Sequence, residues 1–109
     1  MVKEFVWPVR VYYEDTDAGG VVFYANYLAF MERARTEWLR ELGYENSSLA
    51  TGPGVVFAVR RVEVDYLRPA RLDDVLDVTA SLTRISRASL TFGQSVCLGS
   101  EVLCRASVQ

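Results

Sequence analysis

Histidine is missing from this chain of 109 residues, and cysteine is scarce, with Cys97 and Cys104 as the two thiols. Serine–histidine–aspartate and cysteine–histidine catalysis both need an imidazole base, so neither is open to this chain. A structural zinc site needs about four cysteine or histidine ligands, and two thiols cannot supply them. Any catalysis must therefore rest on carboxylates, hydroxyls, backbone amides or a cofactor, and we expect no metal site.

Lysine is also nearly absent, because all but one of the 12 basic residues are arginine. Against 14 acidic residues they give a net charge of −2 and a pI near 5.1, which argues against general nucleic-acid binding. Residues 1–54 carry a net charge of −3 and residues 55–109 one of +1, so an anionic ligand favours the second half. Arginine forks suit phosphate, although an arginine-rich composition alone explains the same pattern.

No stretch of the sequence approaches the roughly 18 apolar residues of a membrane-spanning helix. Residues 1–5 (MVKEF) also lack the apolar core of a signal peptide. We therefore expect a cytoplasmic protein without a membrane span. In that compartment the two cysteines, which lie on one expected hairpin, are most simply buried reduced thiols.

Apolar spacing places one strand and one helix in the first half of the chain. Residues 5–13 are mostly apolar, β-branched or aromatic and predict a strand, with Pro8 restricting its start to an edge or a bulge. From Asn26 to Leu42 apolar residues recur at helical spacing. Asn26 is the expected N-cap and Gly43 the residue that follows the helix.

Alternating segments between residues 62 and 108 predict four further strands, joined as antiparallel hairpins at turns. One long amphipathic helix against a five-stranded, mainly antiparallel sheet is an α+β fold. We expect a single domain over residues 1–109. The chain stops at Gln109 inside a strand pattern, so either this strand ends the protein or the carboxyl-terminal end of the domain is incomplete.

The segment between the first strand and the helix concentrates the chemistry of the chain. Residues 14–20 hold three acids and two glycines, so the backbone turns sharply there. A carboxylate just before a helix N-terminus lies beside unsatisfied N–H groups and the positive end of the helix dipole. Such donors can stabilise a second, developing negative charge, as acyl transfer requires. The alternative is that Asp15 and Asp17 only accept hydrogen bonds from the turn and the helix cap.

Two other interpretations of this segment fail on the residues. A calcium loop needs aspartate or asparagine at its fifth position and glutamate at its twelfth, where this chain has Gly19 and Asn26. An aspartyl-phosphate phosphatase needs a parallel doubly wound sheet, which one helix among hairpins cannot build.

Residues 15–22 (DTDAGGVV), followed by 25–27 (ANY) and 32–37 (ERARTE), resemble the signature of the YbgC-type acyl-CoA thioesterases. These proteins have the hotdog fold and are related to 4-hydroxybenzoyl-CoA thioesterase. Residues 69–74 (PARLDD) are similar to the family's hairpin segment, so the resemblance covers nearly the whole chain. It implies a long central helix wrapped by the sheet, dimers joined edge to edge, dimers paired into homotetramers, and an active site between two subunits.

The resemblance also assigns catalytic roles. Asp17 matches the family's catalytic carboxylate, whereas Asp15 does not, and the backbone N–H of Tyr24 matches the donor that polarises the thioester carbonyl. YbgC-type sequences commonly carry histidine at the position of Tyr24, while the 4-hydroxybenzoyl branch has tyrosine. The substrate branch and the acyl length therefore stay open.

Candidate binding residues come from the aromatic and basic side chains. Phe23 and Tyr24 are candidates for an acyl pocket, whereas we expect Tyr27 and Phe30 to belong to the core. The resemblance makes Arg87 the first candidate for the CoA phosphates, with Arg84 and Arg61 among further candidates. Solvated arginines at strand ends are the alternative.

Together these features predict an enzyme that hydrolyses an acyl-CoA thioester without a cofactor. Asp17 would attack the carbonyl carbon to give a mixed anhydride, or act as general base on a water molecule. A non-catalytic hotdog module that binds acyl-CoA or acyl carrier protein is the alternative, and an interaction partner that uses the charged helix face is a third. Dehydratase relatives of this fold use a catalytic histidine, which this chain lacks.

Overall fold

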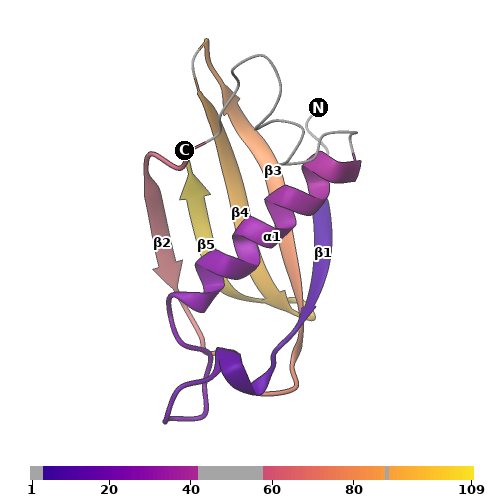
Figure 1. The fold of residues 1–109 in the computed structure, drawn as a ribbon, viewed down its shortest axis with the longest axis vertical. Helices are drawn as coiled ribbons and strands as arrows, with labels where there is room; N and C mark the ends of the chain where they lie inside the picture. Colours follow the sequence, from indigo (N-terminus) through magenta and orange to yellow (C-terminus); the bar gives the residue numbers. More distant parts are fainter. Residues whose placement is uncertain (1–3, 42–57, 88) are drawn as a thin grey trace.

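The computed structural model describes residues 4–41, 58–87 and 89–109, which form one long helix packed on a five-stranded sheet (Figure 1). All neighbouring strands are antiparallel, in the order β1-β3-β4-β5-β2. The predicted α+β class is therefore confirmed. The elements are β1 (Phe5–Arg10), the 3-10 helix η1 (Tyr13–Asp15), α1 (Asn26–Glu41), β2 (Val62–Tyr66), β3 (Val75–Ile85), β4 (Leu90–Leu98) and β5 (Glu101–Val108).

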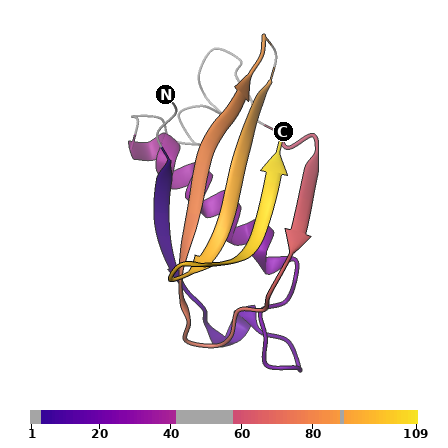
Figure 2. The same cartoon turned by 180° about the vertical axis from the view of Figure 1, so that it is seen from behind.

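Helix α1 crosses one face of the sheet, from β2 and β5 at its start to β1 at its end (Figure 1). Seen from behind, the other face carries none of the described helical residues (Figure 2). None of the described helices is long and apolar enough to cross a membrane. The helix thus has one buried side, and its first turn is fixed over one end of the sheet.

The core lies between α1 and the sheet because two periodicities meet there. Helical spacing puts four residues on the inner side of α1, and alternate residues of β3 point toward them. Burial of these side chains holds the helix to the sheet. The helix contributes Tyr27, Phe30, Met31 and Ala34, and β3 contributes Leu76, Val78 and Ala80.

Gln94 of β4 makes a polar link inside this apolar layer, where it is 3% exposed. Its Nε2 donates to the backbone carbonyls of Met31 (3.0 Å) and Thr79 (3.2 Å), and its Oε1 accepts from Nη1 of Arg35 (2.7 Å). Burial lowers the pKa of Arg35, while the nearby Glu32 carboxylate acts in the opposite direction. One amide therefore ties the middle of α1 to two strands.

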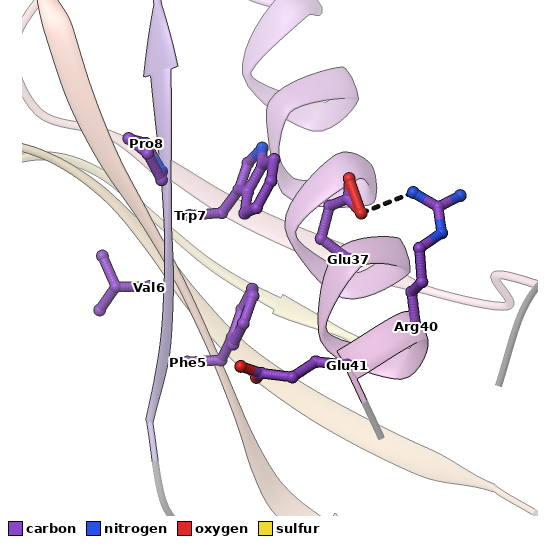
Figure 3. A pocket seen from close by; sticks show the side chains of 7 residues that line it. All are labelled: Phe5, Val6, Trp7, Pro8, Glu37, Arg40 and Glu41. Atoms are coloured by element: carbon purple, nitrogen blue, oxygen red, sulfur yellow. Dashed lines mark hydrogen bonds and ion pairs between the residues drawn. The ribbon is translucent and has the colours of Figure 1, made fainter. Parts of the chain in front are cut away.

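Aromatic side chains join β1 to the last turns of α1. The rings of Phe5 and Trp7 are stacked with centroids 6.4 Å apart, and Phe5 also stacks on Trp38 of α1 at 6.2 Å. Beside them lies a groove of about 430 Å³, whose rim carries Glu37 and Arg40, joined by an ion pair of 2.6 Å (Figure 3). This groove lies at the end of α1, away from its start.

The two cysteines are free thiols. Cys104 is buried, and desolvation raises the pKa of its thiol to about 11. Cys97 is half-buried. The prediction of unbridged thiols is confirmed, with Cys97 less buried than expected.

We expect Gln94→Leu to destabilise the fold by about 1–3 kcal/mol, because it leaves buried polar groups without partners. Urea unfolding would measure this change in the free energy of unfolding. The matched control is Thr83→Val, which removes an exposed hydroxyl from the neighbouring strand and should change it by less than about 0.5 kcal/mol. Equal stability of Gln94→Leu and wild type would contradict the structural role of this link.

Candidate active site

Residues 16–22 form a tight hairpin between η1 and the start of α1. The backbone N–H of Asp17 donates to the carbonyl of Val21 (2.9 Å), and the N–H of Gly20 donates to the carbonyl of Asp17 (3.0 Å). Gly20 has a φ of +79°, a conformation that side chains with a Cβ disfavour. The sharp turn expected from the glycines therefore forms, and Asp17 lies on it.

The Asp17 carboxylate is exposed and oriented by its own turn. Its Oδ1 accepts a hydrogen bond from the N–H of Gly19 (2.8 Å). A Cβ at Gly19 would lie 3.2 Å from this oxygen, so glycine permits the close approach. Among the described residues, Oδ2 of Asp17 has no hydrogen-bond partner. One oxygen is thus fixed, and the other is available to a ligand or a water molecule.

Asp15 is in a different environment, with only 5% of its surface exposed. Its Oδ2 accepts from the N–H of Tyr12 and its Oδ1 from Nδ2 of Asn26, both at 2.9 Å. Its backbone carbonyl accepts from the N–H of Phe23 (2.9 Å). Asp15 therefore fits the alternative that an acid in this turn only accepts hydrogen bonds from neighbouring N–H groups.

The start of the helix corrects one prediction. Asn26, expected as the N-cap that accepts a hydrogen bond from the first turn, is the first residue of α1. Its side chain donates to Asp15 instead. The side chain of an asparagine at this position can accept a hydrogen bond as a helix cap or donate one to a neighbour. Here the buried Asp15 carboxylate lies within hydrogen-bond distance, so Asn26 donates.

Tyr24 precedes α1 by two residues, and the segment of residues 16–22 lies at this end of the helix (Figure 1). Within the described part of the chain, its backbone N–H donates no hydrogen bond. Its side chain is 63% exposed. Tyr24 thus offers a backbone donor just before α1, and the hairpin that carries Asp17 ends two residues earlier in the chain. The catalytic roles of Asp17 and Tyr24 stay predictions.

An aromatic cluster surrounds this helix start. The ring centroids of Phe23 and Tyr24 lie 4.8 Å apart, and Tyr66 packs edge-on to Tyr24 (6.2 Å) and Tyr27 (5.6 Å). Phe23 and Tyr66 are both about half exposed, and Tyr27 and Phe30 are buried as predicted. Tyr66, at the end of β2, was missed by the sequence reasoning. The only sequence feature that could have pointed to Tyr66 is the presence of an aromatic residue at the end of a predicted strand.

Tyr27 also anchors the loop beneath the site. Its hydroxyl accepts a buried hydrogen bond from the N–H of Ala70 (2.9 Å), whose carbonyl accepts from the N–H of Val22 (2.9 Å). Desolvation raises the pKa of the Tyr27 phenol, and the hydrogen bond from Ala70 acts in the opposite direction. The helix and the hairpin are therefore held by the same residue, Ala70.

The predicted phosphate-binding arginines lie elsewhere. Arg84 and Arg87 belong to the β3–β4 hairpin, at the opposite end of the molecule from the Asp17 turn (Figure 1). Arg61 precedes β2 and forms an exposed ion pair with Glu63 (2.8 Å). One chain does not bring these arginines to Asp17, so their role stays a prediction.

Residues 19–105 match the model of the thioesterase superfamily. The chain belongs to this superfamily. It is 52% identical over 92 residues to the acyl-CoA thioester hydrolase YbgC of Escherichia coli O6:H1, covering 84% of this chain and 68% of that protein. It is 44% identical over 105 residues to the acyl-CoA thioesterase YbgC of Haemophilus influenzae, covering 96% and 77%. The family predicted from the sequence is thus confirmed.

A solved structure of this superfamily has the same fold. The crystal structure of a probable thioesterase from Bartonella henselae matches with a TM-score of 0.93 and 37% identity, covering 97% of this chain and 88% of that chain. The arrangement of α1 and the five strands is therefore that of a thioesterase, as expected for the hotdog fold. The prediction that the chain is an enzyme of this family is also confirmed.

We expect Tyr27→Phe to lower the free energy of unfolding by about 1–3 kcal/mol, because the buried N–H of Ala70 loses its acceptor. Urea unfolding is the measurement. Tyr24→Phe removes the hydroxyl of an exposed ring and is the matched control. If both variants changed stability equally, the Tyr27–Ala70 hydrogen bond would not be the anchor of this loop.

Proposed function

We propose that this protein hydrolyses acyl-CoA thioesters to free CoA and a carboxylic acid, with Asp17 as the catalytic carboxylate. The observation that carries the proposal is the state of Asp17: one oxygen is held by Gly19 and the other has no partner among the described residues. The names of the YbgC relatives support the acyl-CoA substrate. No cofactor is needed, because water and a carboxylate suffice for the reaction.

Two routes lead from this carboxylate to the same products. Oδ2 of Asp17 attacks the thioester carbonyl carbon, CoA leaves as the thiolate, and water then hydrolyses the mixed anhydride. Alternatively, the carboxylate takes a proton from a water molecule that attacks the same carbon, the C–S bond then breaks, and the CoA sulfur leaves with that proton as the thiol. Both routes place negative charge on the carbonyl oxygen. Transfer of solvent oxygen into the side chain of Asp17 would identify the first route.

In this proposal the N–H of Tyr24 stabilises that oxygen. It lies at the positive end of the α1 dipole, which favours negative charge. Loss of one such donor typically costs about 3–4 kcal/mol of transition-state stabilisation. Phe23, about half exposed and packed on Tyr24, is assigned to the wall of the acyl pocket.

We further propose that the working enzyme is a homodimer, two of which pair into a homotetramer. Arg84 and Arg87 belong to the β3–β4 hairpin, at the opposite end of the chain from the turn that carries Asp17. A second copy can supply them. Strand β2 is an edge of the sheet, and its Tyr66 belongs to the aromatic cluster at the site, so edge-to-edge pairing there would complete the pocket. Acyl carrier protein is a further proposed partner, because its prosthetic group presents the same thioester.

Asp17→Asn is expected to lower kcat at least about 100-fold without unfolding the protein, because an amide is neither a nucleophile nor a general base here. Thiol release from acyl-CoAs of graded chain length and from an aromatic acyl-CoA measures the rate. Glu14→Gln removes an exposed carboxylate from the same segment and should leave the rate unchanged. Near wild-type turnover by Asp17→Asn would exclude the assignment. A wild-type protein that binds these thioesters without cleaving them would favour the non-catalytic binding module.

Arg87→Ala is expected to raise KM for acyl-CoA about tenfold, because one charge-assisted contact to phosphate is worth roughly 1.5–3 kcal/mol. The same acyl group on N-acetylcysteamine, which lacks the nucleotide, should show no such change. Arg105→Ala is the control, since Arg105 is also exposed but lies in the middle of β5. An unchanged KM for acyl-CoA would remove Arg87 from the phosphate site.

A further inference from the structure

Asp15 is the one buried carboxylate among the described residues, and the proposed reaction does not use it. Removing a carboxylate from water is costly unless hydrogen bonds replace the lost hydration. Here two donors do so, the N–H of Tyr12 and Nδ2 of Asn26, each at 2.9 Å. Both carboxylate oxygens of Asp15 therefore accept hydrogen bonds, whereas among the described residues only one oxygen of Asp17 does.

The hydrogen-bond partners of Asp15 come from three places: the residue before η1, the segment just before α1, and the first residue of α1. Tyr12 follows β1 and leads into the site, and Asn26 is the first residue of α1. The carbonyl of Asp15 holds the N–H of Phe23, the residue immediately before Tyr24. We call Tyr12, Asp15, Phe23 and Asn26 with these three hydrogen bonds the clasp.

Both proposed reacting groups lie close in sequence to residues of the clasp. Asp17 follows Asp15 by two residues, and Tyr24 lies between Phe23 and Asn26, so each reacting group is within two residues of a clasped one. Misplacement of a reacting group by about 1 Å can lower a rate about 100-fold. A residue that fixes the path of the chain on both sides of the hairpin therefore controls catalytic geometry.

We propose that Asp15 is a positioning residue, whose carboxylate sets the orientation of the Tyr24 N–H relative to Asp17 through its hydrogen bond with Asn26. The proposal rests on the proposed function. It requires an acceptor at position 15 and a donor at position 26 but assigns no reacting role to either. Phe23 takes part in the clasp through its backbone N–H alone, and the proposed phosphate-binding arginines lie outside it, so the clasp acts on kcat more than on KM.

An exchange of the two side chains tests this pairing. Asp15→Asn alone replaces the charged acceptor by a neutral amide, which keeps a bond to position 26 only if the Asn26 amide turns over. Asn26→Asp alone places two carboxylates together. The double variant restores the pattern, because the amide introduced at position 15 accepts from Tyr12 and donates to the carboxylate introduced at position 26. That carboxylate is also favoured by the helix dipole.

The experiment measures kcat, KM and urea unfolding for the wild type, both single variants and the double variant, with an acyl-CoA that the wild type hydrolyses. We expect each single variant to lose at least about tenfold in kcat, with a much smaller change in KM. The double variant should recover most of kcat. A double-mutant cycle compares the effect of the double variant on kcat with the sum of the two single effects, and the difference measures the coupling between positions 15 and 26.

Val78→Ala is the stability control, because Val78 is a buried apolar residue of β3 that takes no part in the clasp. It should lower the unfolding midpoint while kcat of the folded protein stays near that of the wild type. If either single variant fails to fold, Asn26→Ala replaces it, since this change removes the donor without adding a charge.

Three results would overturn the proposal: unchanged kcat in Asp15→Asn and Asn26→Ala, a loss of activity that only follows the unfolded fraction, or a double variant no faster than the slower single variant. A wild type that hydrolyses no thioester overturns the proposed function itself. An active, Asp17-dependent wild type whose kcat is insensitive to the clasp overturns this inference alone.

Discussion

Burial of one side of α1 against the sheet is the interaction on which the rest of this structure depends. Four side chains of the helix lie in the core, and the Gln94 amide fixes its middle to β3 and β4. A helix held in this way has a start of defined position and direction. The unsatisfied N–H groups of that start, and the loop that enters it, then become a site of fixed geometry rather than a mobile turn.

Two carboxylates two residues apart illustrate how burial decides their roles. Asp15 is enclosed and has both oxygens occupied, so it can only hold neighbouring groups in place. Asp17 is on an exposed turn with one oxygen occupied, so it can meet a substrate. The spacing of the two acids gives no sign of this difference. It arises because η1 turns the first side chain inward and the glycine-rich hairpin turns the second outward.

The fold could be predicted from the sequence because its signals are local and repeated. Helical spacing from Tyr27 to Ala34 and alternation in β3 to β5 each report one buried face. The donor role of Asn26 and the place of Tyr66 could not be predicted in the same way. Both depend on contacts between separate segments: Asn26 of α1 with Asp15 of η1, and Tyr66 of β2 with Tyr27 of α1. Family resemblance predicted roles for Asp17 and Tyr24 but said nothing of the hydrogen bonds that Asp15 makes with Tyr12, Phe23 and Asn26.

The position of the arginines follows from the geometry of a single antiparallel sheet. Long strands β3 and β4 carry their connecting hairpin to one end of the molecule, whereas α1 begins at the other (Figure 1). In the proposed dimer, a ligand with a reactive thioester at one end and a charged nucleotide at the other would contact the start of α1 in one copy and the β3–β4 hairpin of the second. Among the described strands, β2 forms one edge of the sheet, the kind of strand with which another copy can pair, and its Tyr66 belongs to the aromatic cluster. In the proposed assembly, the edge that joins two copies therefore lies beside the aromatic cluster at the start of α1.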